Sequence, residues 1–125
     1  MTVILSLLDP DKDHLMRTMG PNLNMEPAEL SDQIVKLISR TNSFYDSLEP
    51  ALRSSFELHV HGVLPSASAI MIDVERQTGV IQLETKAYSR PAIEAFGFEV
   101  GYGSGLYASL RDGYLKLIAD GRRLL

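Results

Sequence analysis

Hydrophobic and polar residues alternate along this chain with several different periods. Residues 3–8 form a near-continuous apolar run closed by Asp9 and Pro10, a pattern typical of a strand buried on both faces of a parallel sheet. Between residues 28 and 48 apolar positions recur every three or four residues, which predicts an amphipathic helix of about five to six turns. Residues 56–61 alternate and predict a second strand. Together these segments predict a parallel βαβ unit with a right-handed crossover.

The second half of the chain has the pattern of a hairpin followed by a helix. Residues 69–74 and 80–88 flank a turn that contains Gly79, which predicts an antiparallel pair. Residues 96–100 predict a further short strand, and a helical stripe from Leu106 to Leu124 predicts a C-terminal helix. In that helix Gly113 costs about 1 kcal/mol relative to alanine.

The segment between the first strand and the long helix predicts only a turn, with room for one helical turn before Gly20 and Pro21. The expected fold is therefore a single α/β domain over residues 1–125. It has one mixed sheet of four to five strands, with the long helix (about residues 28–48) and the C-terminal helix packed on it.

Composition restricts the classes of function. The net charge of −4 and a single basic doublet at Arg122 and Arg123 argue against nucleic-acid binding by this domain alone. The absence of cysteine excludes disulfides, thiol nucleophiles and cysteine–zinc sites, and it fits a reducing compartment. No apolar run approaches the roughly 20 residues of a membrane span, and no basic segment precedes the first one. We therefore expect a cytoplasmic protein, and a core strand so near residue 1 suggests a domain taken from a longer chain or one that starts abruptly.

Two histidines are the most conspicuous candidates for chemistry. His59 and His61 point to the same side of their predicted strand, with Glu57 beside them, and their Cα atoms are roughly 6.5 to 7 Å apart. That spacing permits two ligands to one metal ion. Catalytic zinc takes three protein ligands with supporting hydrogen bonds, and no third ligand can be assigned from the sequence. The simpler interpretation is a polar sheet face with hydrogen-bonded histidines.

Two further segments are candidates for ligand binding. The run "GYGSG" at 101–105 contains Ser104, but it lacks the spacing of a phosphate-binding loop and of the dinucleotide fingerprint. A flexible entry to the last helix is therefore the simpler interpretation. Tyr88 and Arg90 place an aromatic ring near a cation, which suits an anion or a planar ring, although an ordinary solvated arginine explains Arg90 as well.

The order of these elements resembles one repeat of the phospholipase D-like fold. The resemblance is carried by "VILSLLDPD", a long helix, "FELHVHG", a proline-bearing link, "SASAIMID" and "GVIQLE". In that family a motif H-x-K-x-x-x-x-D supplies the phosphate chemistry. At the same spacing this chain has Ser66, Ser68 and Asp73, so only the aspartate matches. The chain is therefore similar to degenerate, pseudoenzymatic halves found in bacterial regulators beside DNA-binding or signalling modules.

The resemblance implies a domain without catalytic activity and without a cofactor. Ser66 has no adjacent base to make it nucleophilic, and Ser68 cannot supply a fixed positive charge to a phosphoryl transition state. We expect a regulatory or sensing domain that binds a small anionic ligand or a partner domain in bacterial signalling or transcription control. Two alternatives remain open: a metal-assisted phosphodiesterase or other hydrolase that uses His59 and His61, and a homo-oligomerisation module such as a homodimer.

Overall fold

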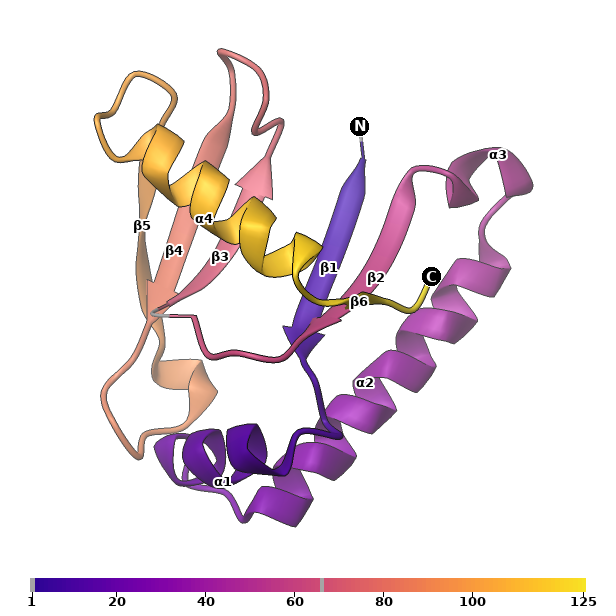
Figure 1. Cartoon of the computed structure of the whole chain (residues 1–125), viewed down its shortest axis with the longest axis vertical. Helices are drawn as coiled ribbons and strands as arrows, with labels where there is room; N and C mark the ends of the chain where they lie inside the picture. The colour runs from indigo at the N-terminus through magenta and orange to yellow at the C-terminus, as the bar shows by residue number, and fades with distance from the viewer. Residues whose placement is uncertain (1, 66) are drawn as a thin grey trace.

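The first half of the chain forms the predicted parallel βαβ unit. The computed structural model describes residues 2–65 and 67–125. Strands β1 (Val3–Leu8) and β2 (Phe56–His61) pair in parallel along their whole length. Three helices connect them, namely α1 (Asp13–Asn22), α2 (Pro27–Ser47) and the short α3 (Pro50–Arg53) (Figure 1). Pro27 occupies the first turn of α2, where a proline costs no hydrogen bond, so this helix begins one residue before its predicted start.

Helix α1 (Asp13–Asn22) replaces the predicted turn after β1 and corrects that expectation. Its buried residues Leu15 and Met16 pack with Leu30 and Ile34 of α2 in one hydrophobic cluster. Gly20 allows the next segment to return closely, because a Cβ there would lie 2.8 Å from the carbonyl oxygen of Met25. Packing against α2 therefore stabilises ten helical residues that the local glycine–proline signal did not predict.

The second half of the chain forms a separate antiparallel sheet. Strands β3 (Ser68–Ile72), β4 (Val80–Thr85) and β5 (Phe96–Gly101) are ordered β3-β4-β5, and a short 3-10 helix η1 (Ala92–Glu94) precedes β5. Helix α4 (Tyr107–Ala119) lies across this sheet (Figure 1). Tyr107 packs with Ile81, Leu83 and Val100 in a second hydrophobic cluster. The hairpin between β3 and β4 agrees with the sequence prediction.

The fold is mixed α/β, but it has two three-stranded sheets where the sequence predicted one sheet of four to five strands. In the described residues β1 pairs only with β2, and β3 pairs only with β4. Strand β2 ends at His61 and β3 begins at Ser68, so the chain changes sheets between these two strands. Pro65, which lies between them, has no N–H to donate to a ladder.

The predicted C-terminal helix is too long, because α4 ends at Ala119 and the chain then forms strand β6 (Arg122–Arg123). Strand β6 pairs antiparallel with β2, so the first sheet is ordered β1-β2-β6. Gly121 makes this return possible, since a side chain there would collide with the carbonyl group of Val60. The Leu124 N–H then donates to the Leu58 carbonyl at 2.7 Å. Over residues 2–65 and 67–125 no helix has both the length and the apolar character needed to cross a membrane.

Candidate functional site

A pocket of about 630 Å³ lies at the carboxyl ends of the two parallel strands. Asp9 directly follows β1 and Gly62 directly follows β2, and both line the pocket. Ligands of α/β proteins bind at this edge of a parallel sheet, because the loops that leave the strands converge there. The remaining lining residues are Lys12, His14, Val60, Val63, Gly113, Lys116, Leu117, Asp120, Gly121 and Arg122.

Asp9 is the buried charge of this pocket, with 6 % of its surface exposed. One carboxylate oxygen accepts the Asp11 N–H at 3.0 Å. The guanidinium of Arg122 lies 3.6 Å from Asp9 and 3.7 Å from Asp11. A buried carboxylate is costly unless it is paired, so this interaction stabilises the contact between β6 and the loop after β1.

The charged residues that line the pocket are three cations and two carboxylates. Lys116 pairs with Asp120 at 2.8 Å, and both side chains are mostly exposed. Lys12, at the N-terminus of α1, has no ion pair within the described part of the chain. The lining therefore has three cations, Lys12, Lys116 and Arg122, and two carboxylates, Asp9 and Asp120, and among the described residues Lys12 is the cation without a carboxylate partner.

His61 lies at the end of β2 and is 6 % exposed. Its Nδ1 atom is 2.8 Å from the Ser6 hydroxyl oxygen, and its Nε2 atom is buried without a hydrogen-bond partner among residues 2–65 and 67–125. Burial lowers the pKa of His61, because it disfavours the charged imidazolium. The Ser6–His61 pair resembles two members of a nucleophilic triad, but no acid in the described part of the chain is hydrogen-bonded to this histidine to orient it.

His59 and Glu57 interact with each other and not with His61. The His59 Nε2 atom is 2.7 Å from a Glu57 carboxylate oxygen, and Arg123 lies 3.2 Å from the other oxygen. Throughout the described ranges, no group of three His, Cys, Asp or Glu side chains is placed to hold a metal ion. The two histidines that the sequence pairs as candidate ligands thus have different partners, Glu57 for one and Ser6 for the other.

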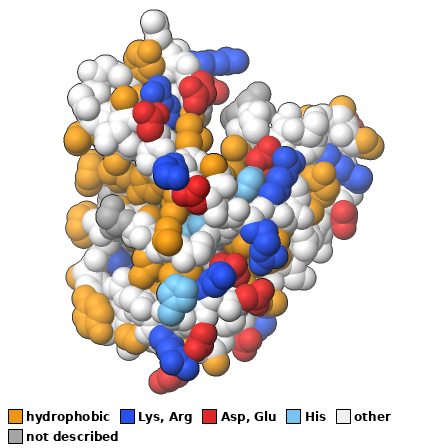
Figure 2. All heavy atoms as spheres, viewed as in Figure 1, with side chains coloured by type: hydrophobic (Ala, Val, Ile, Leu, Met, Phe, Trp, Pro, Cys, Tyr) orange, Lys and Arg blue, Asp and Glu red, His pale blue; other side chains and the backbone are white. Residues whose placement is uncertain are grey.

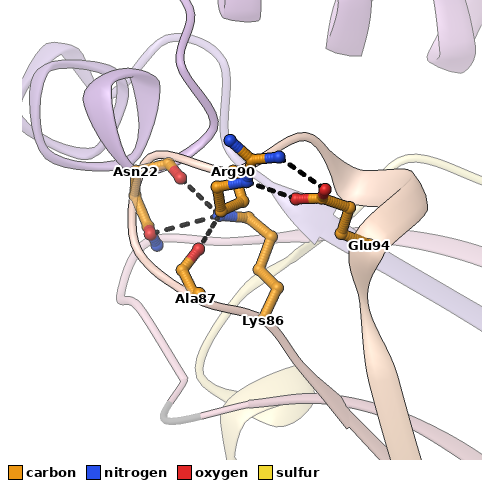
Figure 3. A network of polar contacts seen from close by, with 5 residues as sticks. All are labelled: Asn22, Lys86, Ala87, Arg90 and Glu94. Carbon is orange, nitrogen blue, oxygen red and sulfur yellow. Dashed lines mark hydrogen bonds and ion pairs between the residues drawn. The ribbon is translucent and has the colours of Figure 1, made fainter.

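Tyr88 and Arg90 lie in the loop between β4 and β5, which belongs to the second sheet. Arg90 donates two hydrogen bonds to Glu94, at 2.5 and 2.6 Å, and this bidentate pair raises the pKa of Arg90 and lowers that of Glu94 (Figure 3). In the same network Lys86 donates to the carbonyl oxygen of Asn22 and so ties the loop to α1. Tyr88 is 72 % exposed. The charge of Arg90 is therefore already compensated within the loop.

Ser104 lies in the turn that leads into α4. Its hydroxyl oxygen accepts the Leu106 N–H at 3.3 Å, and its carbonyl oxygen accepts the Tyr107 N–H at 3.1 Å. Both contacts order the entry to the helix. The candidate ligand residues of the sequence therefore fall into three places, namely β2, the loop after β4, and this turn.

Two positions of the degenerate phospholipase D-like motif, Ser68 and Asp73, lie at the two ends of β3. Ser66 lies outside the described residues. Ser68 is the first residue of the strand and is exposed. Asp73 follows the strand with φ of 48°, a left-handed conformation that aspartate tolerates in turns, and its carbonyl oxygen accepts the Arg76 N–H at 2.9 Å. Five residues of strand separate Ser68 from Asp73 by about 17 Å, so these two do not form one site.

No protein-family model, curated protein or solved structure matches this chain. The resemblance to the phospholipase D-like fold therefore stays a prediction. The pocket residues Lys12, Lys116 and Arg122 were not among the candidates from sequence. One feature of the sequence does indicate the position of this pocket. Asp9 directly follows a predicted parallel strand, and the loops after such strands form binding sites.

Proposed function

We propose that this chain is a non-catalytic regulatory domain that binds a small anionic ligand in the pocket at the carboxyl ends of β1 and β2. The observation that supports this proposal is a pocket of about 630 Å³ whose lining has three cations against two carboxylates, with the ammonium group of Lys12 unpaired among the described residues. That volume falls within the range of roughly 300–1,000 Å³ typical of small-molecule sites. The domain would report occupancy of the pocket to a partner domain.

The charges of the pocket suggest how such a ligand is held. The ammonium group of Lys12 is free to approach an anion. Arg122 lies 3.6 Å from Asp9, farther than the roughly 2.7–2.9 Å of a charge-assisted hydrogen bond, so its donors can turn toward a ligand. Asp9 repels an anion placed deep in the pocket and accepts hydrogen bonds from hydroxyl or amino groups. A ligand with an anionic group at the rim and a donor group below therefore fits best.

We propose a domain without catalytic activity because the residues at the phospholipase D-like motif positions differ from those of the family. Where the phospholipase D-like motif has His and Lys, the chain has Ser66 and Ser68, which offer neither a phosphate nucleophile nor a fixed charge. A bacterial, cytoplasmic setting in signalling or transcription control belongs to the proposal through the same resemblance. The hydrolase alternative finds no support in the contacts of His59 and His61, which have separate partners.

The test is a ligand titration of the full chain. Inorganic phosphate and a set of mononucleotides are titrated by calorimetry, with melting temperature as a second measurement. Ligand at about 100 times its dissociation constant should stabilise the fold by about 2.7 kcal/mol. Lys12→Gln should weaken binding about tenfold, because one rim cation is lost. Lys36→Gln, which removes an exposed lysine on α2, is the matched control. If no anion shifts the melting temperature, or if both variants weaken binding equally, the pocket is not the site.

A further inference from the structure

Strand β5 is an edge of the second sheet and its outer side is unpaired. The strand order β3-β4-β5 leaves β5 with one neighbour, and in the described part of the chain no other segment pairs with residues 96–101. Five of its six residues are exposed, and only Val100 is buried. An exposed strand edge offers a row of free N–H and C=O groups and pairs readily with another strand unless charges, proline or a covering element prevents it.

The side chains of β5 do little to prevent such pairing. Phe96 and Phe98 point to the same face of the sheet as Leu83 and Val100, yet they are 62 % and 56 % exposed. The one charged residue of the strand, Glu99, points to the opposite face, where Gln82 donates a hydrogen bond to it at 2.9 Å. Hydrophobic side chains gather over the second sheet in the space-filling view (Figure 2). The edge is therefore apolar on one face and singly charged on the other.

We infer that a second copy of this chain pairs antiparallel with β5 about a two-fold axis through Phe98. In an antiparallel pair, side chains opposite each other point to the same face of the sheet. Residues on one face are an even number of positions apart, so the two-fold axis must pass beside one residue, which then lies opposite its own copy. An axis through Phe98 sets the two Phe98 rings side by side and each Phe96 beside the partner's Val100. It also sets Glu99 opposite Gly97. An axis through Glu99 would set two carboxylates against each other, which is unfavourable.

The outer edge of β5 is complementary to a second copy of the same edge. The register through Phe98 pairs nearly the whole strand, and every pair is apolar or involves glycine, so the surface is complementary to itself, as a two-fold interface requires. The four exposed phenyl rings of such a dimer bury roughly 500 Å² of apolar surface, since an aromatic side chain buries about 150–250 Å² in full. The rings alone supply less than half of the roughly 1,200–2,000 Å² of total surface that a stable interface buries, so we expect a weak dimer that dissociates on dilution.

Sedimentation of the full chain over roughly 1 µM to 1 mM tests this inference. The mass should rise from monomer to dimer. Phe98→Lys should weaken the dimer about 100-fold, because two rings are lost and two ammonium groups face each other. Ile70→Lys is the matched control: Ile70 is 50 % exposed and lies on β3, at the other edge of the same sheet. It should leave the dimer intact. Phe98→Thr removes the ring without a charge and serves if the lysine variant fails to fold.

The absence of cysteine allows the register to be measured directly. Phe98→Cys removes the ring and so weakens the non-covalent dimer, but at a chain concentration of about 1 mM mild oxidation should trap the paired copies as a disulfide, because the two Cβ atoms of residue 98 lie about 4.5–5.5 Å apart across the axis. Phe96→Cys should crosslink poorly, since it faces Val100 of the other copy. A monomer at all concentrations, a dimer that Phe98→Lys leaves intact, equal loss in both lysine variants, or equal crosslinking at both positions would each overturn the inference. These outcomes do not depend on the ligand proposal, whose pocket lies at the first sheet.

Discussion

Acidification below about pH 6.5 should destabilise this protein through His61. The imidazole is 6 % exposed, its Nδ1 atom contacts the Ser6 hydroxyl, and burial lowers its pKa. The unfolded chain therefore takes up a proton at a higher pH than the folded chain does. Between these two pKa values the unfolded state binds more protons, so the free energy of unfolding falls as the pH falls. Above the unfolded value the stabilising contribution is complete.

The size of the effect follows from the uptake of one proton. The free energy of unfolding should fall by up to about 1.4 kcal/mol for each pH unit below 6.5. The loss ends at the folded pKa, where both states are protonated. Because small domains are stable by only about 5–15 kcal/mol, the change should be plain in a denaturation curve.

Urea unfolding at pH values of about 7.5, 6.5 and 5.5 measures this dependence. His61→Asn removes the titration and keeps an amide that can contact the Ser6 hydroxyl, so its unfolding free energy should vary less with pH. His14→Asn changes an exposed histidine of α1 and should keep the full slope. If the His61→Asn protein loses stability with acid as steeply as the wild type, the buried imidazole is not the source and the reasoning is refuted.

Two further predictions concern the cores of the two sheets. Leu58→Ala should lower the free energy of unfolding in urea by about 2–5 kcal/mol, because Leu58 is fully buried on β2. Leu52→Ala, on the exposed helix α3, should lower it much less, and equal losses would contradict the packing described. Tyr107→Phe should cost about 1–3 kcal/mol, because the buried Tyr107 hydroxyl donates to the Val74 carbonyl at 2.7 Å. Tyr88→Phe, at a tyrosine that is 72 % exposed, should leave the melting temperature unchanged, and an equal shift in both variants would argue against a role for this hydrogen bond.

Segments whose own periodicity determines their structure were predictable from the sequence. Helix α2 occupies Pro27–Ser47 where the apolar repeat predicted residues 28–48. The alternation of Phe56, Leu58 and Val60 predicted β2, and its parallel pairing with β1 follows from the long helix between them. In each case the local pattern and the tertiary packing favour the same structure.

Segments that depend on distant contacts were not predictable in the same way. Residues 106–124 carry a helical stripe, but the chain leaves the helix after Ala119 because pairing with β2 satisfies the backbone of Arg122 and Arg123. The division into two sheets likewise depends on where β3 lies relative to β2, and periodicity contains no information about that placement. In helix α1 distant contacts favour a helix where the local sequence favours a turn, because the packing of Leu15 and Met16 outweighs the local signal.

The candidate pocket shows why a site can be harder to predict than the fold around it. Its cations come from three segments that are far apart in the chain: Lys12 before α1, Lys116 in α4 and Arg122 in β6. None of them stands in a motif, and each has an ordinary surface interpretation on its own. They meet because β6 returns to β2 and places Arg122 beside Asp9. The rim of the pocket thus requires the pairing of β6, and a ligand that binds there would stabilise the end of the chain together with the parallel sheet.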